Sequence, residues 1–417
     1  MKYTKLQIGI IVFGITVAIV LRLLFLSDME WKWDEKWMWI HSLDWSHRNV
    51  LPEVGVMSGG GIVNTGVSTW PFIAMQYLNI GPIEMVLGVS LLNILAIFVF
   101  YHSLKSWNPK WNNFILLGIV MASTHVLHIV YSRKIWAQDL LPFFTCFSFW
   151  GFVNRKHLLG VVVWALSLCL AGQVHMSGFY LAAGMFFAAI WYDGGFKKAQ
   201  FWIYKFAGTC ILGILPSIPW VLYVLHNSKK SSASLLGIIK LEYLIRFVSD
   251  TVGINVFYSL GNDMKEFFKE PILGFPSYIM FICLLVTAII FLYVLILLFI
   301  KKEIRNIVWL DRESKFIFIA YMFIPFILLT LSGIPVRDHY FIVAFPMIQI
   351  LFTLLLSKIN IKMVYLVIVL QCIISIQFFY FVHKKDVIQG DYGKPFSKQT
   401  FEERTHYDSD TMKIIFE

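Results

Sequence analysis

The sequence predicts an all-α integral membrane protein, a bundle of about eleven transmembrane helices with interfacial helices on its outer face. Its composition is one reason: 58% of the 417 residues are hydrophobic and 14% are charged, whereas soluble domains carry roughly 25% charged residues. A second reason is that apolar runs long enough to cross a bilayer recur along the whole chain. The third is that the net charge of +10 lies in short loops between these runs. That placement is typical of membrane orientation and argues against nucleic-acid binding.

The candidate spans are apolar runs that approach or exceed the length of about 18 residues needed for a transmembrane helix. The break between the fifth and sixth runs, at Gln173–Gly178, is short. The first run is expected to stay as a span rather than be cleaved as a signal peptide, because no small-residue cleavage site follows it. In chain order the candidates are 6–26, 82–104, 113–131, 138–153, 158–173, 176–192, 202–226, 273–300, 316–333, 340–357 and 362–382.

Basic residues in alternate loops predict the orientation, because cytoplasmic loops carry an excess of Lys and Arg. The basic loops contain Lys2, Lys5, Lys105, Lys110, Arg155, Lys156, Lys197, Lys198, Lys301, Lys302, Arg305, Lys358 and Lys362. This pattern predicts a multi-pass protein of the cell membrane with its N-terminus in the cytoplasm. The segments then expected on the outer face are 27–81, 131–139, 227–271, 333–340 and the polar tail 383–417.

Two outer segments have the pattern of helices that lie in the membrane interface. Residues 31–48 carry Trp33, Trp37 and Ile40 on one side with charges between them, and residues 235–248 are similar. The predicted organisation is a transmembrane module, an outer loop with an interfacial helix, a second group of transmembrane helices and a polar outer tail. Their bounds are 1–226 (with 27–81 as its first outer loop), 227–271, 272–382 and 383–417.

Adjacent carboxylates follow the first span, at Asp34 and Glu35. Transfer of a sugar from a lipid phosphate needs one base to deprotonate the acceptor hydroxyl. It needs no separate general acid, because phosphate is already a good leaving group. One carboxylate with cations at the leaving phosphate is therefore sufficient. The alternative is that Asp34 caps the interfacial helix, a common role of aspartate.

The second outer segment contains Arg133 and Asp139, six residues apart at the boundary of a span. Arg133 could bind a phosphate through two hydrogen bonds, and Asp139 could orient the guanidinium. The alternative is an arginine that extends its charge to the interface beside a helix-capping aspartate.

Further polar residues stand at the outer ends of later spans. His175 lies in the break between two spans, where it is either a ligand or an interfacial side chain. Arg337, His339 and Tyr340 open a late span, and two potential cations with a phenol suit an anionic group. The alternative for this cluster is an interfacial anchor of Arg and Tyr.

The cysteines do not indicate a metal or a disulfide framework. All of them lie inside apolar stretches without metal-binding spacing, and we expect buried free thiols. No cofactor is expected to be required, and the sequence does not indicate a divalent metal, although one is compatible with it. The five are Cys146, Cys169, Cys210, Cys283 and Cys372.

Together these residues resemble the GT-C glycosyltransferases, polytopic enzymes that use polyprenyl-phosphate sugar donors, and most of all the branch of protein O-mannosyltransferases and aminoarabinose transferases. The family's acidic pair in the first outer loop is matched by WDEKWMW, with Asp34 and Glu35. Its S-R-x-x-x-x-x-D-x-L pattern is matched at 132–141, and its R-Y-x-x-x-x-x-P pattern only loosely by RDHYFIVAFP. The similarity covers roughly residues 1–200 well and the rest weakly. The large outer domain of several members has no counterpart in this sequence, which puts a polypeptide acceptor in doubt.

The resemblance implies a helical bundle with its active site at the outer face. Asp34 would be the general base, and Arg133, Arg337 and His339 would hold the donor phosphate. Glu35 and Asp139 would hold the site together. His175 and Tyr340 are candidates for substrate binding from their own positions at the ends of spans. The implied reaction is inverting transfer of one sugar from a polyprenyl phosphate to a lipid or glycan hydroxyl, with membrane lipids as the surroundings.

Two other functions remain open from the sequence. A polymerase or ligase of lipid-linked surface glycan also has many spans with outer Arg and His residues, but it usually has a larger outer loop and does not require the acidic pair. A lipid or glycan transporter would favour charges in mid-span and an internal repeat. Neither feature is clear in this chain.

Overall fold

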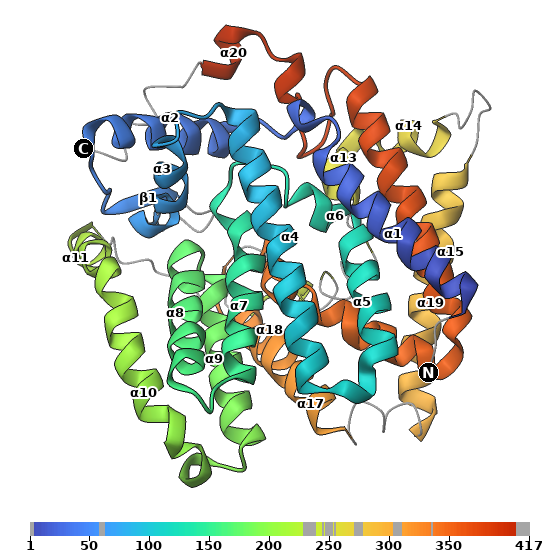
Figure 1. Cartoon of the computed structure of the whole chain (residues 1–417). Helices are drawn as coiled ribbons and strands as arrows, with labels where there is room; N and C mark the ends of the chain where they lie inside the picture. The colour runs from blue at the N-terminus through green and yellow to red at the C-terminus, as the bar shows by residue number, and fades with distance from the viewer. Residues whose placement is uncertain are drawn as a thin grey trace.

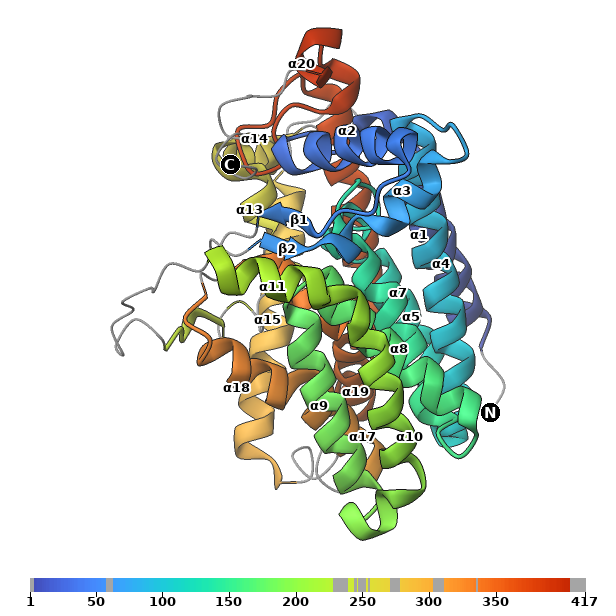
Figure 2. The same cartoon turned by 90° about the vertical axis from the view of Figure 1, so that its left-hand side faces the viewer.

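The computed structural model describes residues 4–57, 63–227, 239–243, 246, 253, 256–270, 278–302, 311–334 and 337–405. The chain forms a helical bundle, with one end covered by a crosswise layer that contains most of residues 27–81, the loop predicted to be outside (Figures 1 and 2). The predicted all-α polytopic fold is confirmed. Six helices of the described residues are long and apolar enough to cross a membrane.

The first half of the bundle follows the predicted spans closely. The predicted span 113–131 is divided at His125, whose backbone is extended, and the predicted span 202–226 continues through a 3-10 turn. In chain order the helices are α1 (Lys5–Leu23), α4 (Pro82–Trp107), α5 (Asn112–Thr124), α6 (Val126–Val130), α7 (Leu141–Val153), α8 (Leu158–Val174), α9 (Ser177–Tyr192), α10 (Phe196–Ile214) and α11 (Ile218–Asn227).

The second half contains three long apolar helical runs. The last of them, α19, has a non-helical residue at Asn360, so its two parts correspond to the predicted spans 340–357 and 362–382. Residues Asp338–Ala344, at the start of the first of these spans, form a 3-10 helix instead. The elements are α13 (Val256–Leu260), α14 (Met264–Lys269), α15 (Ile279–Ile300), α17 (Arg312–Ile317), the π-helical η8 (Phe318–Phe323), α18 (Ile324–Thr330), η9 (Asp338–Ala344) and α19 (Met347–Lys384).

The helices pack closely where small residues allow it. A Cβ added at Gly14 of α1 would lie 2.3 Å from Val120 of α5 and 3.6 Å from Ile368 of α19. Close approach at small residues is typical of helix packing in membranes, where no hydrophobic force acts between helices. Thr4 begins α1 by accepting the backbone N–H of Gln7, whose side chain in turn reaches Tyr365 at 2.6 Å. The first span is therefore held between α5 and α19.

The crosswise layer is formed mainly by the loop between α1 and α4. Its helix α2 (Trp33–Arg48) lies across the end of the bundle (Figure 2), and the predicted helix over 31–48 is confirmed. A short antiparallel pair, β1 (Val54–Met57) and β2 (Val63–Thr65), leads to α3 (Trp70–Gln76). The other predicted interfacial helix, 235–248, falls mostly outside the described residues.

The tail after α19 belongs to the same layer. The Tyr392 hydroxyl donates to the Asp28 carbonyl at 2.6 Å, and the Phe396 N–H donates to the Met29 carbonyl at 3.0 Å. Two short elements follow, η10 (Phe396–Lys398) and α20 (Phe401–Thr405). The tail is thus docked on the segment that leads into α2.

Candidate active site

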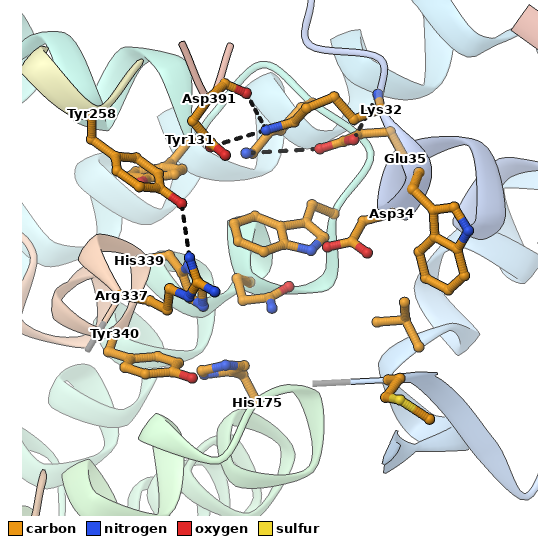
Figure 3. Close-up of a pocket in the computed structure, with 16 residues that line it drawn as sticks. Lys32, Asp34, Glu35, Tyr131, His175, Tyr258, Arg337, His339, Tyr340 and Asp391 are labelled. Atoms are coloured by element: carbon orange, nitrogen blue, oxygen red, sulfur yellow. Dashed lines mark hydrogen bonds and ion pairs between the residues drawn. The ribbon is translucent and has the colours of Figure 1, made fainter. Parts of the chain in front are cut away.

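A cavity of about 450 Å³ lies between the crosswise layer and the end of the bundle. α2 contributes to one side, and the segment before α19 contributes to the opposite side (Figure 3). Six of the predicted site residues line it, namely Asp34, Glu35, His175, Arg337, His339 and Tyr340. The other lining residues are Lys32, Trp33, Val56, Met57, Tyr131, Lys134, Trp136, Gln138, Tyr258 and Asp391.

The two adjacent carboxylates of α2 have different tasks. Glu35 is buried, and its Oε2 accepts the backbone N–H of Lys32 at 3.0 Å, so Glu35 caps the start of the helix. Asp34 makes none of the capping hydrogen bonds of α2. It is half-buried and points into the cavity (Figure 3). The capping role considered for Asp34 therefore belongs to its neighbour.

The surroundings of Asp34 favour its neutral form. Burial raises the pKa of its carboxyl to about 7, and the charge of Glu35 acts in the same direction. Lys134, Lys32 and the indole of Trp136 act in the opposite direction but do not offset burial. A carboxyl with a pKa near neutral pH is suited to accept a proton, because a base works best when its pKa is close to the working pH.

Two lysines are held beside the carboxylates. Lys134 is buried, pairs with Glu30 and lies 3.8 Å from Glu35. The Lys32 ammonium lies 2.9 Å from the Asp391 carboxylate and 3.7 Å from Glu30. Although burial acts against the charged forms, these carboxylates raise the pKa of both lysines. Both ammonium groups are therefore charged at neutral pH.

His175 is fixed by the turn between α8 and α9. Its Nδ1 accepts the Ser177 N–H at 3.3 Å and lies 2.8 Å from the Ser177 hydroxyl. The turn is tight, since a Cβ added at Gly178 would lie 2.2 Å from the carbonyl carbon of Ala171. Burial lowers the pKa of His175 to about 3, so the ring is neutral at physiological pH.

His339 and Tyr340 complete an aromatic wall with His175. The rings of His175 and Tyr340 stack with centroids 5.1 Å apart, and the rings of His339 and Trp136 form a T-shaped pair with centroids 4.6 Å apart. Burial, followed by the neighbouring His175 and the charges of Lys134 and Arg337, lowers the pKa of His339 well below its usual value. His339 was expected as a cation for phosphate. It is instead neutral, because the site removes it from water among other positive groups.

Arg337 keeps an exposed guanidinium at the cavity. Its Nη1 donates to the Tyr258 hydroxyl at 3.2 Å, and within the described ranges it forms no ion pair with a carboxylate. An arginine that is oriented but not neutralised can bind an anion through its remaining N–H groups.

Arg133 does not line the cavity, and the expectation that it shares one site with Arg337 is wrong. Its guanidinium donates to the carbonyls of Leu21 at 2.7 Å and Phe25 at 2.6 Å, and lies 4.4 Å from the ring centroid of Phe379. The side chain is used to close the end of α1 against α19. The carbonyls of the last turn of a helix have no intrahelical partner, and the buried Arg133 satisfies that of Leu21 here. The Phe25 carbonyl accepts the Asp28 N–H as well as Arg133.

Asp139 also lies outside the lining of the cavity. Its side chain is fully buried, and its backbone carbonyl accepts Asn93 at 2.9 Å. Neither carboxylate oxygen has a hydrogen-bond partner within the described residues. Asp139 therefore does not orient Arg133, although its charge acts on Lys134.

Sequence reasoning did not single out Lys32, Lys134, Tyr258 and Asp391. Lys134 stands directly beside Arg133 and Lys32 stands two positions before Asp34, and a lysine near a conspicuous Asp or Arg gives no signal of its own. Asp391 comes from the tail, which was expected only to be polar and outside. Within the residues that the structure describes, no group of three or more His, Cys, Asp or Glu is placed to hold a metal ion.

Comparison with known proteins gives a structural likeness only. No family model matches the chain, and no curated protein sequence matches it. The crystal structure of ArnT from Cupriavidus metallidurans in the apo state is similar at 12% identity with a TM-score of 0.52, and it covers 84% of this chain and 60% of that chain. The chain has a GT-C fold.

A second crystal structure of ArnT supports the same conclusion about the fold. ArnT from Cupriavidus metallidurans bound to undecaprenyl phosphate is similar at 12% identity with a TM-score of 0.50, over 84% of this chain and 60% of that one. The chain thus spans 60% of the length of the ArnT structures that it matches. The GT-C resemblance inferred from the sequence is confirmed for the fold.

Proposed function

We propose that the chain is an inverting glycosyltransferase that moves one sugar from a polyprenyl phosphate to a hydroxyl of a lipid or glycan acceptor, at the outer face of the cell membrane. The observation that carries the proposal is the pairing, in one cavity of a GT-C fold, of the Asp34 carboxyl with three fixed cations. Asp34 has a pKa of about 7, and the cations are Arg337, Lys32 and Lys134.

Asp34 is the proposed general base. An acceptor hydroxyl has to lose its proton as it attacks the anomeric carbon, and a carboxylate within hydrogen-bond reach accepts that proton in the transition state. Glu35 cannot take this role as readily, because one of its oxygens caps α2 and the other lies towards Lys134. Its proposed role is to position Lys134 and the start of α2.

The cations are proposed to hold the donor phosphate. As the anomeric bond breaks, the phosphate gains negative charge, and fixed positive groups stabilise that charge more in the transition state than in the ground state. Arg337 is the principal candidate because it is exposed to the cavity and forms no ion pair within the described ranges. Lys134 takes the place that the sequence suggested for Arg133.

The solved relative supports this class of donor. The structurally similar ArnT was crystallised with undecaprenyl phosphate, and a polyprenyl phosphate offers the anionic group that these cations require. A glycan polymerase or ligase also transfers a glycan to a hydroxyl, so the Asp34 carboxyl, with its pKa of about 7, fits that reaction too, and the donor separates the two enzymes. A transporter would need no base at all, so the same feature disfavours it.

The decisive experiment uses the purified full chain in liposomes with radiolabelled undecaprenyl phosphate-linked glucose, and cell-envelope lipids and glycans as acceptors. We expect transfer of label to an acceptor, with inversion at the anomeric carbon and release of undecaprenyl phosphate. Movement of intact donor across the bilayer without bond cleavage would instead establish a transporter. Transfer of a pre-assembled glycan, with none from the single-sugar donor, would establish a ligase or polymerase.

A further inference from the structure

The cavity has two walls of different electrical character. One wall carries the ionised groups around α2, including Lys32, Glu35 and Asp391. The other wall is formed by His175, His339 and Tyr340, whose rings contact one another (Figure 3). These three groups are polar, but the site keeps them uncharged. Arg337 lies beside His339 and Tyr340, whereas His175 lies farther from it (Figure 3). A ligand that fills the cavity is therefore expected to present an anion to Arg337 and the lysines and a neutral polar group to His175.

His175 has a hydrogen-bond donor that the protein leaves unused. Because the backbone N–H of Ser177 can only donate, Nδ1 of His175 is an acceptor, and in the neutral ring the proton is on Nε2. His175 lines the cavity and is 1% exposed, yet its Nε2 has no hydrogen-bond partner in the described part of the chain. A buried donor without a partner is destabilising, so such groups are expected to have a partner in the functional complex.

The partner of this donor is expected to be an uncharged oxygen. A phosphate or carboxylate would be attracted to the ammonium groups of Lys32 and Lys134 and to the exposed guanidinium of Arg337, where its charge is compensated. Beside His175, whose pKa is lowered by burial with no contribution from a charged group of the described residues, it would lose water without gaining a counter-charge, which is unfavourable in a buried site. An ammonium group would meet the same cost there. A hydroxyl or ring oxygen of a sugar has no such cost.

We propose that the wall of His175, His339 and Tyr340 is the subsite for the transferred sugar, that His175 donates its Nε2–H to an oxygen of that sugar, and that the sugar is uncharged. This inference rests on the proposed function, which supplies the polyprenyl-phosphate sugar. It adds the chemical class of the sugar and the residues that distinguish a sugar-linked donor from the bare lipid phosphate.

The test compares lipids that differ only in the sugar. His175→Phe removes the donor but keeps a ring that can stack on Tyr340, and His175→Gln returns a neutral donor. The matched control is His157→Phe. The two histidines flank opposite ends of α8: His157 comes just before the helix and His175 just after it. His157 is exposed and does not line the cavity. Binding to purified protein is measured for undecaprenyl phosphate, undecaprenyl phosphate-linked glucose and undecaprenyl phosphate-linked glucuronic acid.

We expect His175→Phe to weaken binding of the glucose-linked lipid by about tenfold, the scale of one buried hydrogen bond. Binding of undecaprenyl phosphate should stay unchanged, which also shows that the variant is folded. His175→Gln should recover most of the loss, His157→Phe should match the parent protein, and the parent protein should bind the glucose-linked lipid more tightly than the glucuronic acid-linked one.

Three results would overturn the sugar assignment while leaving the proposed function in place. In the first, His175→Phe weakens binding of the glucose-linked lipid and of undecaprenyl phosphate equally. In the second, it weakens binding of neither. In the third, the parent protein binds the glucuronic acid-linked lipid more tightly than the glucose-linked one. If the parent protein binds neither undecaprenyl phosphate nor its sugar-linked forms, the proposed function fails, and this inference fails with it.

Discussion

Replacing Asp34 with asparagine removes a carboxylate while it keeps the size and most of the polarity of the side chain. If Asp34 is the general base, turnover should fall by about a hundredfold or more, since a positioned base contributes roughly 10²–10⁴. Because its pKa is about 7, kcat/KM of the parent protein should rise about tenfold between pH 6 and pH 8 as the carboxyl ionises. The Asn variant should lose this rise.

Stability should respond in the opposite direction. Burial raises the pKa of Asp34 from 3.8 to about 7, so the folded state binds the proton more tightly than the unfolded chain. The free energy of unfolding therefore decreases as pH rises through this window, by at most about 4 kcal/mol. Asparagine carries no charge and avoids the penalty. The variant should melt at the same temperature or higher at pH 8 although it is nearly inactive.

The assay is release of undecaprenyl phosphate from the glucose-linked donor, measured from pH 5.5 to 8.5 with thermal melting of the same samples. Asp44→Asn is the matched control, because Asp44 is an exposed residue of the same helix that pairs with Arg48 outside the cavity lining. It should change turnover by less than about twofold, as expected for an exposed ion pair. Near-normal turnover of Asp34→Asn, or a retained rise with pH, would refute the role of Asp34.

Three further predictions concern the cations and the orientation. Arg337→Lys should lower kcat/KM by about tenfold, because a point charge replaces a bidentate contact with phosphate, and Arg337→Ala should lower it by about a hundredfold, because the contact is lost. Neither variant should lose folded protein. Equal activity of both variants and the parent protein would exclude Arg337 from the site. Arg133→Ala should act on the fold instead, lowering the melting temperature by several degrees because the Leu21 carbonyl loses its donor and the Phe379 ring loses its cation. A large loss of kcat in a variant with unchanged melting would contradict this. A cysteine replacing Asp44 should be labelled by an impermeant maleimide on intact cells, whereas one replacing Ser106 should not. The reverse pattern would show that the orientation in the membrane is opposite to the predicted one.

Much of the fold could be predicted from the sequence because a backbone in lipid must satisfy its own hydrogen bonds. Each span therefore has to be a helix with a continuous apolar sequence. The predicted spans 6–26 and 273–300 correspond to α1 and α15. The break of the predicted span 113–131 at His125 was not predictable, because an apolar run shows where a chain is buried and not where its backbone bends.

Only part of the site could be predicted, because the sequence does not show which way a side chain points. Polar residues at the outer ends of spans are unusual enough to be found, and Asp34, His175 and Arg337 were found in this way. Which of two neighbours faces the cavity depends on the packing of helices far away in the chain. Arg133 is drawn to the end of α1 and Lys134 to the carboxylates, although their sequence positions are adjacent.

The sequence by itself determined the class of the protein, the order of its spans, the basic loops that predict its orientation and the presence of an acidic pair after the first span. These depend on local composition, which every segment carries with it. Only the tertiary structure decided that Glu35 caps α2 and leaves Asp34 for the cavity, and that Asp391 reaches Lys32 from the tail. It also decided that His175 and His339 are neutral. Those properties depend on burial and on charges brought from distant parts of the chain, and no single segment encodes them.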